Sequence, residues 1–505
     1  MATVQPSAYN FSCQRSVVLT TRATGKSARV ADADHRRIIP LGLGGSRAMS
    51  DAHSQLEADI AALEGLPVFV AYNANVDAVV RVGEELESFL ERPSDPGSEL
   101  PSSPLHSKRE LAAAITHTMA AGRGDEIAMT DAFAATLEAD LEPDSQQMGG
   151  QTGIMTNLLT ALGTAPITYT YLVSDRQLSM FDHPDEIRYP TVDDGQVRYV
   201  PLPEAVNTDR TKINWVFEFR TGDEFFGVTA PEDTRFIAAS RPPEFDLSAG
   251  ELDEAIDQVG EAVDGALLAG YHNLTPAHVE DGYEETHRHA REVIRRLRSG
   301  SDVDVHVEYA VTHDDDLRAS MYEWILPEAT VVGADTHELT ILHDDAGLEV
   351  VAEPPSEATP FEPDEILDHY RMLEAVREEL GVDCIQLHAM EYHLAVMESY
   401  HSPKALRRGL EFSAVNAATK AALGHISESA DLETGLEYEP SAMGREAIGL
   451  LADHLGETAD GGVLTTPTVA ACPNRVVDEP AGTVGIGDIV SSSSFVLELA
   501  VANDQ

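Results

Sequence analysis

The chain has 505 residues, enough for one large α/β domain and a smaller one, and 43% of them are hydrophobic, as in a folded globular protein. Asp and Glu total 87 against 34 Lys and Arg, a formal net charge of −53, so binding of DNA or RNA through phosphates is disfavoured. Three scattered cysteines exclude a disulfide framework or a zinc cluster, and no apolar run approaches the roughly 20 residues of a membrane helix.

The acidic charge is spread along the whole chain, and only five lysines remain. Self-repulsion of this size loosens a compact fold at low salt, whereas at molar salt the Debye length falls to about 3 Å. We therefore interpret the chain as a cytoplasmic protein of an organism with a salt-rich cytoplasm, with no nucleic-acid or membrane partner. The alternative is a protein that mimics or avoids nucleic acid, but such acidity is usually gathered in a tail.

Residues 1–48 differ from the rest, with seven Lys or Arg against two acids and no periodic apolar spacing. We expect this segment to be disordered, or to precede a true start near Met49. An Arg- and Ser-rich transit peptide is the alternative. The segment is left out of the predicted fold.

From residue 67 onward, strand-like and helix-like stretches alternate. A helix is predicted at Ile154–Leu162, where apolar residues recur every three or four positions before Gly163. This alternation predicts an α/β fold with a mostly parallel central sheet flanked by helices. The predicted strands are Val68–Tyr72, Ala266–Ala269, Val303–Tyr309, Thr330–Val332, Cys384–Leu387 and Val463–Ala471.

Two passages break this alternation and predict a small inserted α+β lid. Ile213–Phe219 and Phe225–Val228 flank Thr221-Gly222-Asp223, a pattern that favours an antiparallel hairpin. The second passage, from about Glu84 to Asp144, is irregular and polar. The lid is predicted to comprise residues 84–144 and 201–235, and the large nucleotide-binding domain residues 49–83, 145–200 and 236–505.

A glycine-rich turn, Gly485-Ile486-Gly487-Asp488, precedes an apolar helical stretch. Backbone amides bared by glycines at a helix N-terminus form an anion site suited to phosphate oxygens. Asp488 could then take the proton from a hydroxyl that attacks phosphorus. The alternative is that Asp488 is an ordinary helix N-cap.

Two segments offer groups for sugar hydroxyls. Asn75 and Asp77 follow an apolar strand, and ligands of parallel sheets bind at strand ends. Gly150 would let a substrate approach the backbone at the start of a helix, where Gln151 offers both a donor and an acceptor. The alternatives are a polar turn for the first segment and a glycine turn that opens a helix for the second.

Two acidic motifs are candidate metal ligands. His306 and Glu308 are two apart in a strand and share one face, and a carboxylate near a phosphate suits Mg²⁺, held through water. Asp335 and Glu338 are three apart and meet on one side of a helical turn. The alternatives are the solvent face of an edge strand for the first pair and surface decoration for the second.

Together these motifs resemble the ADP-dependent sugar kinases, the archaeal ADP-dependent glucokinases and phosphofructokinases of the ribokinase-like superfamily. The segments AYNANVDA, QMGGQTGIMTNLL, HVEYA and NRVVDEPAGTVGIGD stand in the family's order between Leu66 and Leu499. The resemblance implies a ribokinase-like fold and transfer of the β-phosphoryl group of ADP to a sugar hydroxyl, assisted by Mg²⁺. The expected partners are ADP and a sugar or sugar phosphate, bound by a monomer or small homo-oligomer.

The resemblance also implies roles for individual residues. Asp488 matches the catalytic base, and Gly485 and Gly487 the turn whose amides receive the phosphate. The positions that match sugar-binding residues are Asn75, Asp77, Gly150 and Gln151. The positions that match the Mg²⁺ motifs are His306, Glu308 and Glu338, together with Asp335, which stands where the family has asparagine. A carboxylate at this position can still hold metal-bound water, so we expect function to be retained.

Three residues bear on which sugar is used. Glu126 lies where members acting on glucose carry a glutamate, and its carboxylate would repel a sugar phosphate. Lys212 and Arg235 resemble the basic positions that phosphofructokinase members use for the 6-phosphate, although Lys212 could also be a surface residue. We expect fructose 6-phosphate or dual activity ahead of glucose alone. Two rival functions stay open: an ATP-dependent ribokinase-type kinase, and a non-catalytic sugar or nucleotide sensor on the same fold.

Overall fold

The computed structural model describes residues 43–98, 100–279, 282–301, 303–348 and 361–503, with side chains from Ser50 onward. The chain divides into two compact units, Met1–Met49 and Ser50–Gln505, and the sheets and the candidate site lie within the second. Helix α1 (Leu43–Leu63) starts before this boundary. The expectation for residues 1–42, including Cys13, lies outside the described residues. Within the described ranges, no helix is both long and apolar enough to span a membrane.

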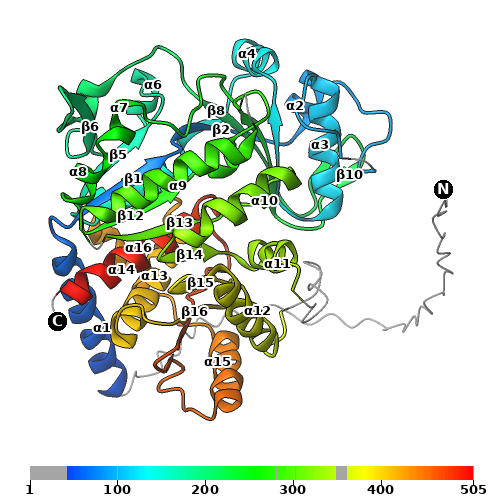
Figure 1. The fold of residues 1–505 in the computed structure, drawn as a ribbon. Helices are drawn as coiled ribbons and strands as arrows, with labels where there is room; N and C mark the ends of the chain where they lie inside the picture. Colours follow the sequence, from blue (N-terminus) through cyan, green and yellow to red (C-terminus); the bar gives the residue numbers. More distant parts are fainter. Residues whose placement is uncertain (1–42, 99, 280–281, 302, 349–360, 504–505) are drawn as a thin grey trace, which may run out of the picture. The chain divides into compact units, whose positions relative to one another are not determined.

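Eleven strands of the described chain form one large sheet, and seven neighbouring strands in it run parallel (Figure 1). In spatial order the parallel strands are β15 (Cys384–His388), β14 (Val331–Ala334), β13 (Asp304–Glu308), β12 (Gly265–Ala269), β1 (Pro67–Tyr72), β5 (Ala165–Thr170) and β6 (Arg188–Asp193). Antiparallel strands complete the two edges, with β16 (Tyr392–Met397), β18 (Val469–Pro473) and β17 (Leu464–Thr465) at one and β7 (Gln196–Pro201) at the other. The predicted mostly parallel central sheet is confirmed.

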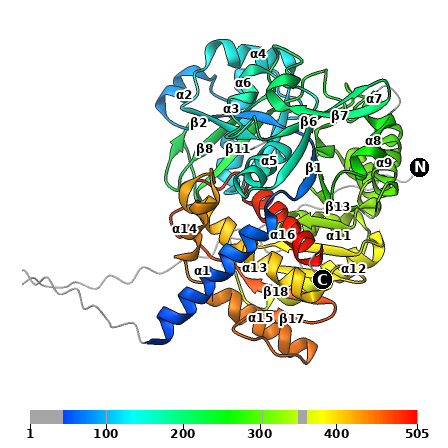
Figure 2. The same ribbon diagram turned by 90° about the vertical axis from the view of Figure 1, so that its left-hand side faces the viewer.

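The strands are continuously apolar because helices cover both faces of the sheet. In β1, Val68 and Val70 belong to one core and Phe69 and Ala71 to the other, as the two-residue period of a strand requires. Figures 1 and 2 show α13 and α16 side by side. The helices on the Val68 side are α5 (Gln151–Ala161), α13 (Pro403–Leu423) and α16 (Ile486–Asn503), and those on the Phe69 side include α9 (Tyr283–Ser299), α10 (Asp315–Trp324), α12 (Glu365–Leu380) and α15 (Ala442–Leu455).

Five of the six predicted strands lie within about two residues of strands in the structure, and the predicted helix at Ile154–Leu162 corresponds to α5, which starts three residues earlier. The prediction of a single strand at Val463–Ala471 is wrong, because this stretch forms the antiparallel pair β17 and β18. The hydroxyl of Thr466 accepts hydrogen bonds from the amides of Thr468 and Val469, which closes a tight turn between the two strands.

A second sheet of five strands lies in the same unit, in the order β3 (Asp125–Met129), β11 (Thr234–Ser240), β8 (Ile213–Phe219), β2 (Asn75–Arg81) and β4 (Ser145–Gly149). Helices α3 (Lys108–Ala121) and α4 (Asp131–Asp140) pack their apolar residues against it. The smaller α+β part that the sequence predicts is therefore present. Strands β2 and β4 come from stretches outside residues 84–144 and 201–235, and the domain boundaries stay a prediction.

The predicted hairpin of Ile213–Phe219 with Phe225–Val228 is wrong, because the antiparallel partner of β8 is β11. The second stretch divides instead into two very short strands that pair with each other, β9 (Glu224–Phe225) and β10 (Val228–Thr229). The chain reverses between β9 and β10 at Phe226 and Gly227, which have φ of 48° and 86°. The sequence pattern places this reversal at Gly222.

Candidate active site at the junction of the two sheets

The chain passes between the two sheets four times, and the first two of these crossings lie together. Strand β1 ends at Tyr72 and β2 begins at Asn75, whereas β4 ends at Gly149 and α5 begins at Gln151. A Cβ on Gly150 would lie 2.5 Å from the carbonyl oxygen of Asn73, so the two crossings touch through their backbones. This contact puts both predicted sugar-binding segments in one place.

Bare glycines make room for the Asn75 and Asp77 side chains. A Cβ on Gly149 would lie 2.1 Å from Oδ1 of Asp77, and a Cβ on Gly150 would lie 2.7 Å from Oδ1 of Asn75. Gly150 also has φ of 74°, in the left-handed region that disfavours side chains. Asn75 donates from Nδ2 to Oδ1 of Asp77 at 2.7 Å. Substituting either glycine would therefore displace the polar pair.

Two buried acceptor atoms at this junction have no hydrogen-bond partner among the described residues. Asn75 is fully buried, yet its Oδ1 has no hydrogen-bond partner among the described residues, and neither has the buried Oε1 of Gln151. An unsatisfied buried acceptor costs about 1–3 kcal/mol, which ligand hydroxyls would recover. Burial raises the pKa of Asp77 to about 7, against the opposing hydrogen bond from Asn75.

Lys212 is buried at the same junction and is not a surface residue. Its Nζ donates to Oδ1 of Asn73 at 2.7 Å and to Oδ1 of Asn273 at 2.9 Å. Burial lowers the pKa of Lys212 well below its usual value, and the positive charge of Arg241 adds to this effect. Lys212 thus fixes the Asn73 crossing and keeps one of its three ammonium protons for a ligand.

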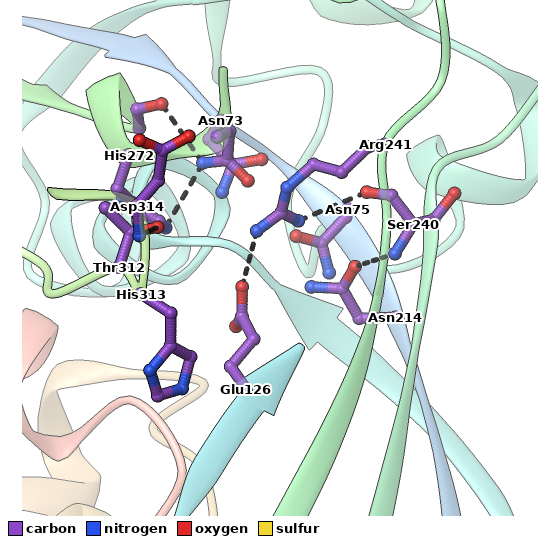
Figure 3. Close-up of polar contacts among 12 residues, drawn as sticks. Asn73, Asn75, Glu126, Asn214, Ser240, Arg241, His272, Thr312, His313 and Asp314 are labelled. Carbon is purple, nitrogen blue, oxygen red and sulfur yellow. Dashed lines mark hydrogen bonds and ion pairs between the residues drawn. The ribbon is translucent and has the colours of Figure 1, made fainter. Parts of the chain in front are cut away.

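Glu126 on β3 is paired with a cation that the sequence did not reveal. Nη2 of Arg241, just beyond β11, lies 2.6 Å from Oε1 of Glu126 (Figure 3). Burial alone would raise the pKa of Glu126, but the charge of Arg241 and its hydrogen bond to the carboxylate outweigh burial and lower the pKa. Burial lowers the pKa of His272 to about 3, so this imidazole is neutral near pH 7.

The ion pair of Glu126 and Arg241 faces a cavity of about 750 Å³. Its walls include the loops at 274–278 and 311–314, the end of β3 and His272 (Figure 3). This volume falls within the range of small-molecule sites. His313 closes one side by binding Oδ1 of Asp125 through Nε2 at 2.7 Å.

The glycine-rich turn packs against α5, the helix that begins at Gln151. A Cβ on Gly485 would lie 2.6 Å from Cδ1 of Ile154, in the first turn of that helix. Helix α16 begins at Ile486, which places Asp488 in its first turn and excludes the N-cap alternative. Burial raises the pKa of Asp488 well above its usual value, and Glu308 and Asp77 reinforce this effect.

The His306 and Glu308 pair lies in the centre of the large sheet, which excludes the edge-strand alternative. Both residues are buried, and Nε2 of His306 lies 3.0 Å from Oε2 of Glu308. Gly333 on β14 provides the space, since a Cβ there would lie 2.2 Å from Oε2 of Glu308. His388, at the end of β15, places Nε2 3.8 Å from the other carboxylate oxygen.

Asp335 and Glu338 form a capping box at the start of α11 (Thr336–Asp345), each side chain accepting from the other's backbone amide at 2.8 Å. Burial raises the pKa of Glu338 well above its usual value, and the charges of Asp335, Glu308 and Asp488 add to it. In the described ranges, no three His, Cys, Asp or Glu side chains are arranged to hold a metal ion directly. The concentrated negative charge fits a hydrated Mg²⁺, which commonly keeps several waters.

Arg235 on β11 reaches the glycine-rich turn. Its Nη1 donates to Oγ1 of Thr483 at 3.4 Å, and its buried Nε has no partner among the described residues. Burial lowers the pKa of Arg235, while the charges of Asp77 and Glu218 oppose this change. The structure thus places Arg235 against the segment that leads into the glycine-rich turn and Arg241 beside Glu126.

A smaller apolar pocket of about 190 Å³ adjoins the same turn. Its walls combine the ends of β15 and β18 with α13 and the first turns of α16, and they include His388, Met390, Val477 and Ile486. Three segments far apart in sequence contribute, residues 388–393, 417–421 and 474–490, so no single local motif predicts this pocket.

The chain resembles known proteins over most of its length. Residues 66–497 match the family model of the ADP-specific phosphofructokinase/glucokinase conserved region. The chain is 29% identical over 464 residues to an ADP-specific phosphofructokinase of Pyrococcus furiosus, which covers 86% of this chain and 97% of that protein. It is 28% identical over 463 residues to an ADP-dependent glucose/glucosamine kinase of Pyrococcus abyssi, covering 90% and 98%.

A solved structure of an ADP-dependent kinase in complex with fructose 6-phosphate and ADPβS superimposes with a TM-score of 0.79. The two chains are 28% identical, and the match covers 91% of this chain and 99% of that one. The predicted ribokinase-like α/β fold is confirmed.

Proposed function

Because the chain belongs to the ADP-specific phosphofructokinase/glucokinase family, we propose that it transfers the β-phosphoryl group of ADP to fructose 6-phosphate or glucose and releases AMP. One observation carries this proposal. Three parts of the structure meet at a single junction: the glycine-rich turn with Asp488, the unpaired acceptor atoms of Asn75 and Gln151, and the acidic cluster of Glu308. Phosphoryl transfer needs these parts together, since it depends on positioning and electrostatic stabilisation.

ADP would bind along the turn. The amides at Gly485 and Gly487 are suited to its β-phosphate, and the adjoining apolar pocket of about 190 Å³ is suited to its base. Glu308 and Glu338, with His306 and Asp335 behind them, would hold Mg²⁺ through water. When bound, the ion would neutralise charge on the phosphates.

Asp488 would act as the general base. The sugar oxygen attacks the β-phosphorus, its proton passes to the Asp488 carboxylate, and the bond to the bridging oxygen of ADP breaks. The raised pKa of Asp488 makes its carboxylate a better proton acceptor. Arg235 would contact the same phosphoryl group from β11, which its contact with Thr483 supports.

The sugar would lie between Asp488 and β2. Oδ1 of Asn75 and Oε1 of Gln151 would accept from its hydroxyls, and Asp77 would orient Asn75 through their 2.7 Å hydrogen bond. The close approach of Gly150 to the Asn73 backbone brings these groups within reach of one ligand.

The ion pair of Glu126 and Arg241 favours activity on both sugars. With glucose, Glu126 would keep Arg241 and accept from a hydroxyl. With fructose 6-phosphate, the phosphate would compete with Glu126 for Arg241. It would also accept a hydrogen bond from the remaining proton of Lys212. The acidic chain and its distribution of charge support a cytoplasmic monomer or small homo-oligomer without nucleic-acid or membrane partners.

The test is AMP release from ADP and Mg²⁺ at molar KCl, with glucose and with fructose 6-phosphate side by side. We expect AMP with both sugars and none without sugar. Activity with ATP but not ADP would favour the ribokinase-type rival. Sugar binding by calorimetry with no product from either nucleotide would favour the sensor.

A further inference from the structure

Lys420 is one of only five lysines in the chain, and it lies in the last turn of α13. Its side chain is half-buried, and Nζ donates to the carbonyl oxygen of Gly424 at 2.5 Å. Within the described residues, this is the one hydrogen bond of its ammonium group. Two of its three protons therefore remain for a ligand.

The charges of three carboxylates on separate elements act on this ammonium group. Asp488 lies on α16, Asp77 on β2 and Asp182 in the loop after α6 (Asp175–Leu178). Burial lowers the pKa of Lys420, and these three negative charges oppose that change, Asp488 most strongly. In the described chain, Lys420 nevertheless forms no ion pair within 4.0 Å. A gap thus separates the ammonium group from the Asp488 carboxylate.

The end of α13 is fixed directly to the segment that leads into the glycine-rich turn. The amide of Ala481 donates to the carbonyl oxygen of Ala421 at 2.7 Å. A Cβ on Gly482 would lie 3.7 Å from the Cα of Gly424, an ordinary contact distance. The position of Lys420 relative to Gly485 is consequently set by backbone contacts on both sides.

A second cation approaches this turn from the small sheet. Arg235 contacts Thr483 from β11, whereas Lys420 belongs to the layer of helices on the large sheet. Both residues oppose the rise in the pKa of Asp488, and the effect of Lys420 is the larger. The positive charges of Arg235 and Lys420 thus act on Asp488 from two different sides of the glycine-rich turn.

A plainer role for Lys420 is to cap the C-terminus of α13 through Gly424. Lysines often interact favourably with the last carbonyls of a helix. Capping uses one proton, however, and an exposed lysine would serve it without the loss of hydration that lowers the pKa here. Capping alone leaves the half-burial and the two unused protons unexplained.

We propose that Lys420 is a catalytic residue that donates hydrogen bonds to the phosphoryl group in transit between ADP and the sugar. This inference rests on the proposed function. The phosphorus–oxygen bond to the bridging oxygen of ADP breaks, a bond to the sugar oxygen forms, and the sugar proton passes to Asp488. Lys420 keeps its proton throughout and compensates the negative charge on the moving group.

Three substitutions separate this role from capping. Lys420→Met removes the charge and the donor, Lys420→Gln keeps an amide donor for Gly424, and Lys420→Arg keeps the charge. Lys404→Met, at the exposed start of the same helix, is the matched control. We expect kcat to fall by about 10²–10³ for Met and Gln, as for loss of one transition-state donor. Arginine should recover part of the loss, and the control should match the wild type.

Calorimetric titration with ADP and with AMP gives a readout independent of turnover. Because Lys420 is proposed to contact the β-phosphate, Lys420→Gln should weaken ADP binding at least about 10-fold and AMP binding less than about twofold. A lowered melting temperature would identify a variant whose loss of activity comes from loss of structure. Wild-type kcat in Lys420→Gln, or equal weakening of ADP and AMP, would overturn the inference. A wild-type protein that releases no AMP from ADP would instead overturn the proposed function.

Discussion

Substituting Gly333 by alanine should displace the side chains of Glu308 and His306 in the acidic cluster. The new methyl group would lie 2.2 Å from Oε2 of Glu308 and 2.7 Å from Nε2 of His306, whereas Cβ contacts under 3.0 Å essentially never occur. The glutamate oxygen must therefore move by about 0.8 Å. Gly333 pairs with Glu308 in neighbouring central strands, so the backbone cannot easily give way.

This displacement has two measurable consequences. Overpacking a buried site typically costs about 1–3 kcal/mol, which for a chain of this size lowers the melting temperature by a few degrees. Misplacing a residue that supports a metal site commonly costs about 10–100-fold in metal affinity or activity. We expect Gly333→Ala to need at least about 10-fold more Mg²⁺ for half-maximal AMP release.

The assay is a Mg²⁺ titration of AMP release, with melting curves at the same KCl concentration. Gly449→Ala is the matched control, since a Cβ at this helical position meets nothing within 4 Å. It should keep wild-type activity and gain up to about 1 kcal/mol of stability. A Gly333→Ala variant with the wild-type Mg²⁺ dependence would refute the assignment of Glu308 to the metal site.

Three further predictions concern Glu126, the hydrogen bond between His313 and Asp125, and the dependence of stability on salt. Glu126→Gln should free Arg241, raising kcat/KM for fructose 6-phosphate and lowering it for glucose; parallel changes in both would contradict the competition model. The hydrogen bond to Asp125 raises the pKa of His313, against burial and the charges of Arg123 and Arg318, so its stabilising effect is present below about pH 6.5 and is lost as pH rises through the raised value. The melting temperature of the wild type should therefore exceed that of His313→Gln at pH 6 by more than at pH 8.5, and a constant difference would disprove the contact. Lowering KCl from about 2 M to 0.1 M extends the Debye length from a few ångströms to about 10 Å and should lower the melting temperature, whereas unchanged stability would contradict the role of screened charge.

The sequence was informative where function depends on glycines next to polar residues. Asp488, Asn75 and Gln151 each lie within two residues of a glycine or at a strand end, and such patterns can be recognised without a fold. The parallel sheet was equally accessible, because strands buried on both faces are continuously apolar.

Contacts between distant segments gave no such signal. Arg241 and Lys420 are 115 and 68 residues from Glu126 and Asp488, and neither lies in a recognisable motif. The hairpin prediction failed because the glycine at 222 was a stronger local signal than Gly227, although Gly227 makes the reversal. Long-range pairing, as of β8 with β11, decides such cases.

The central claim is that Asp488 removes the proton of the sugar hydroxyl during transfer. Single-turnover measurement of AMP formation by Asp488→Asn tests it, with ADP binding and melting temperature recorded on the same sample. We predict a rate about 10²–10⁴ lower than wild type, with ADP binding and stability retained. A rate within a factor of about three of wild type would contradict the account.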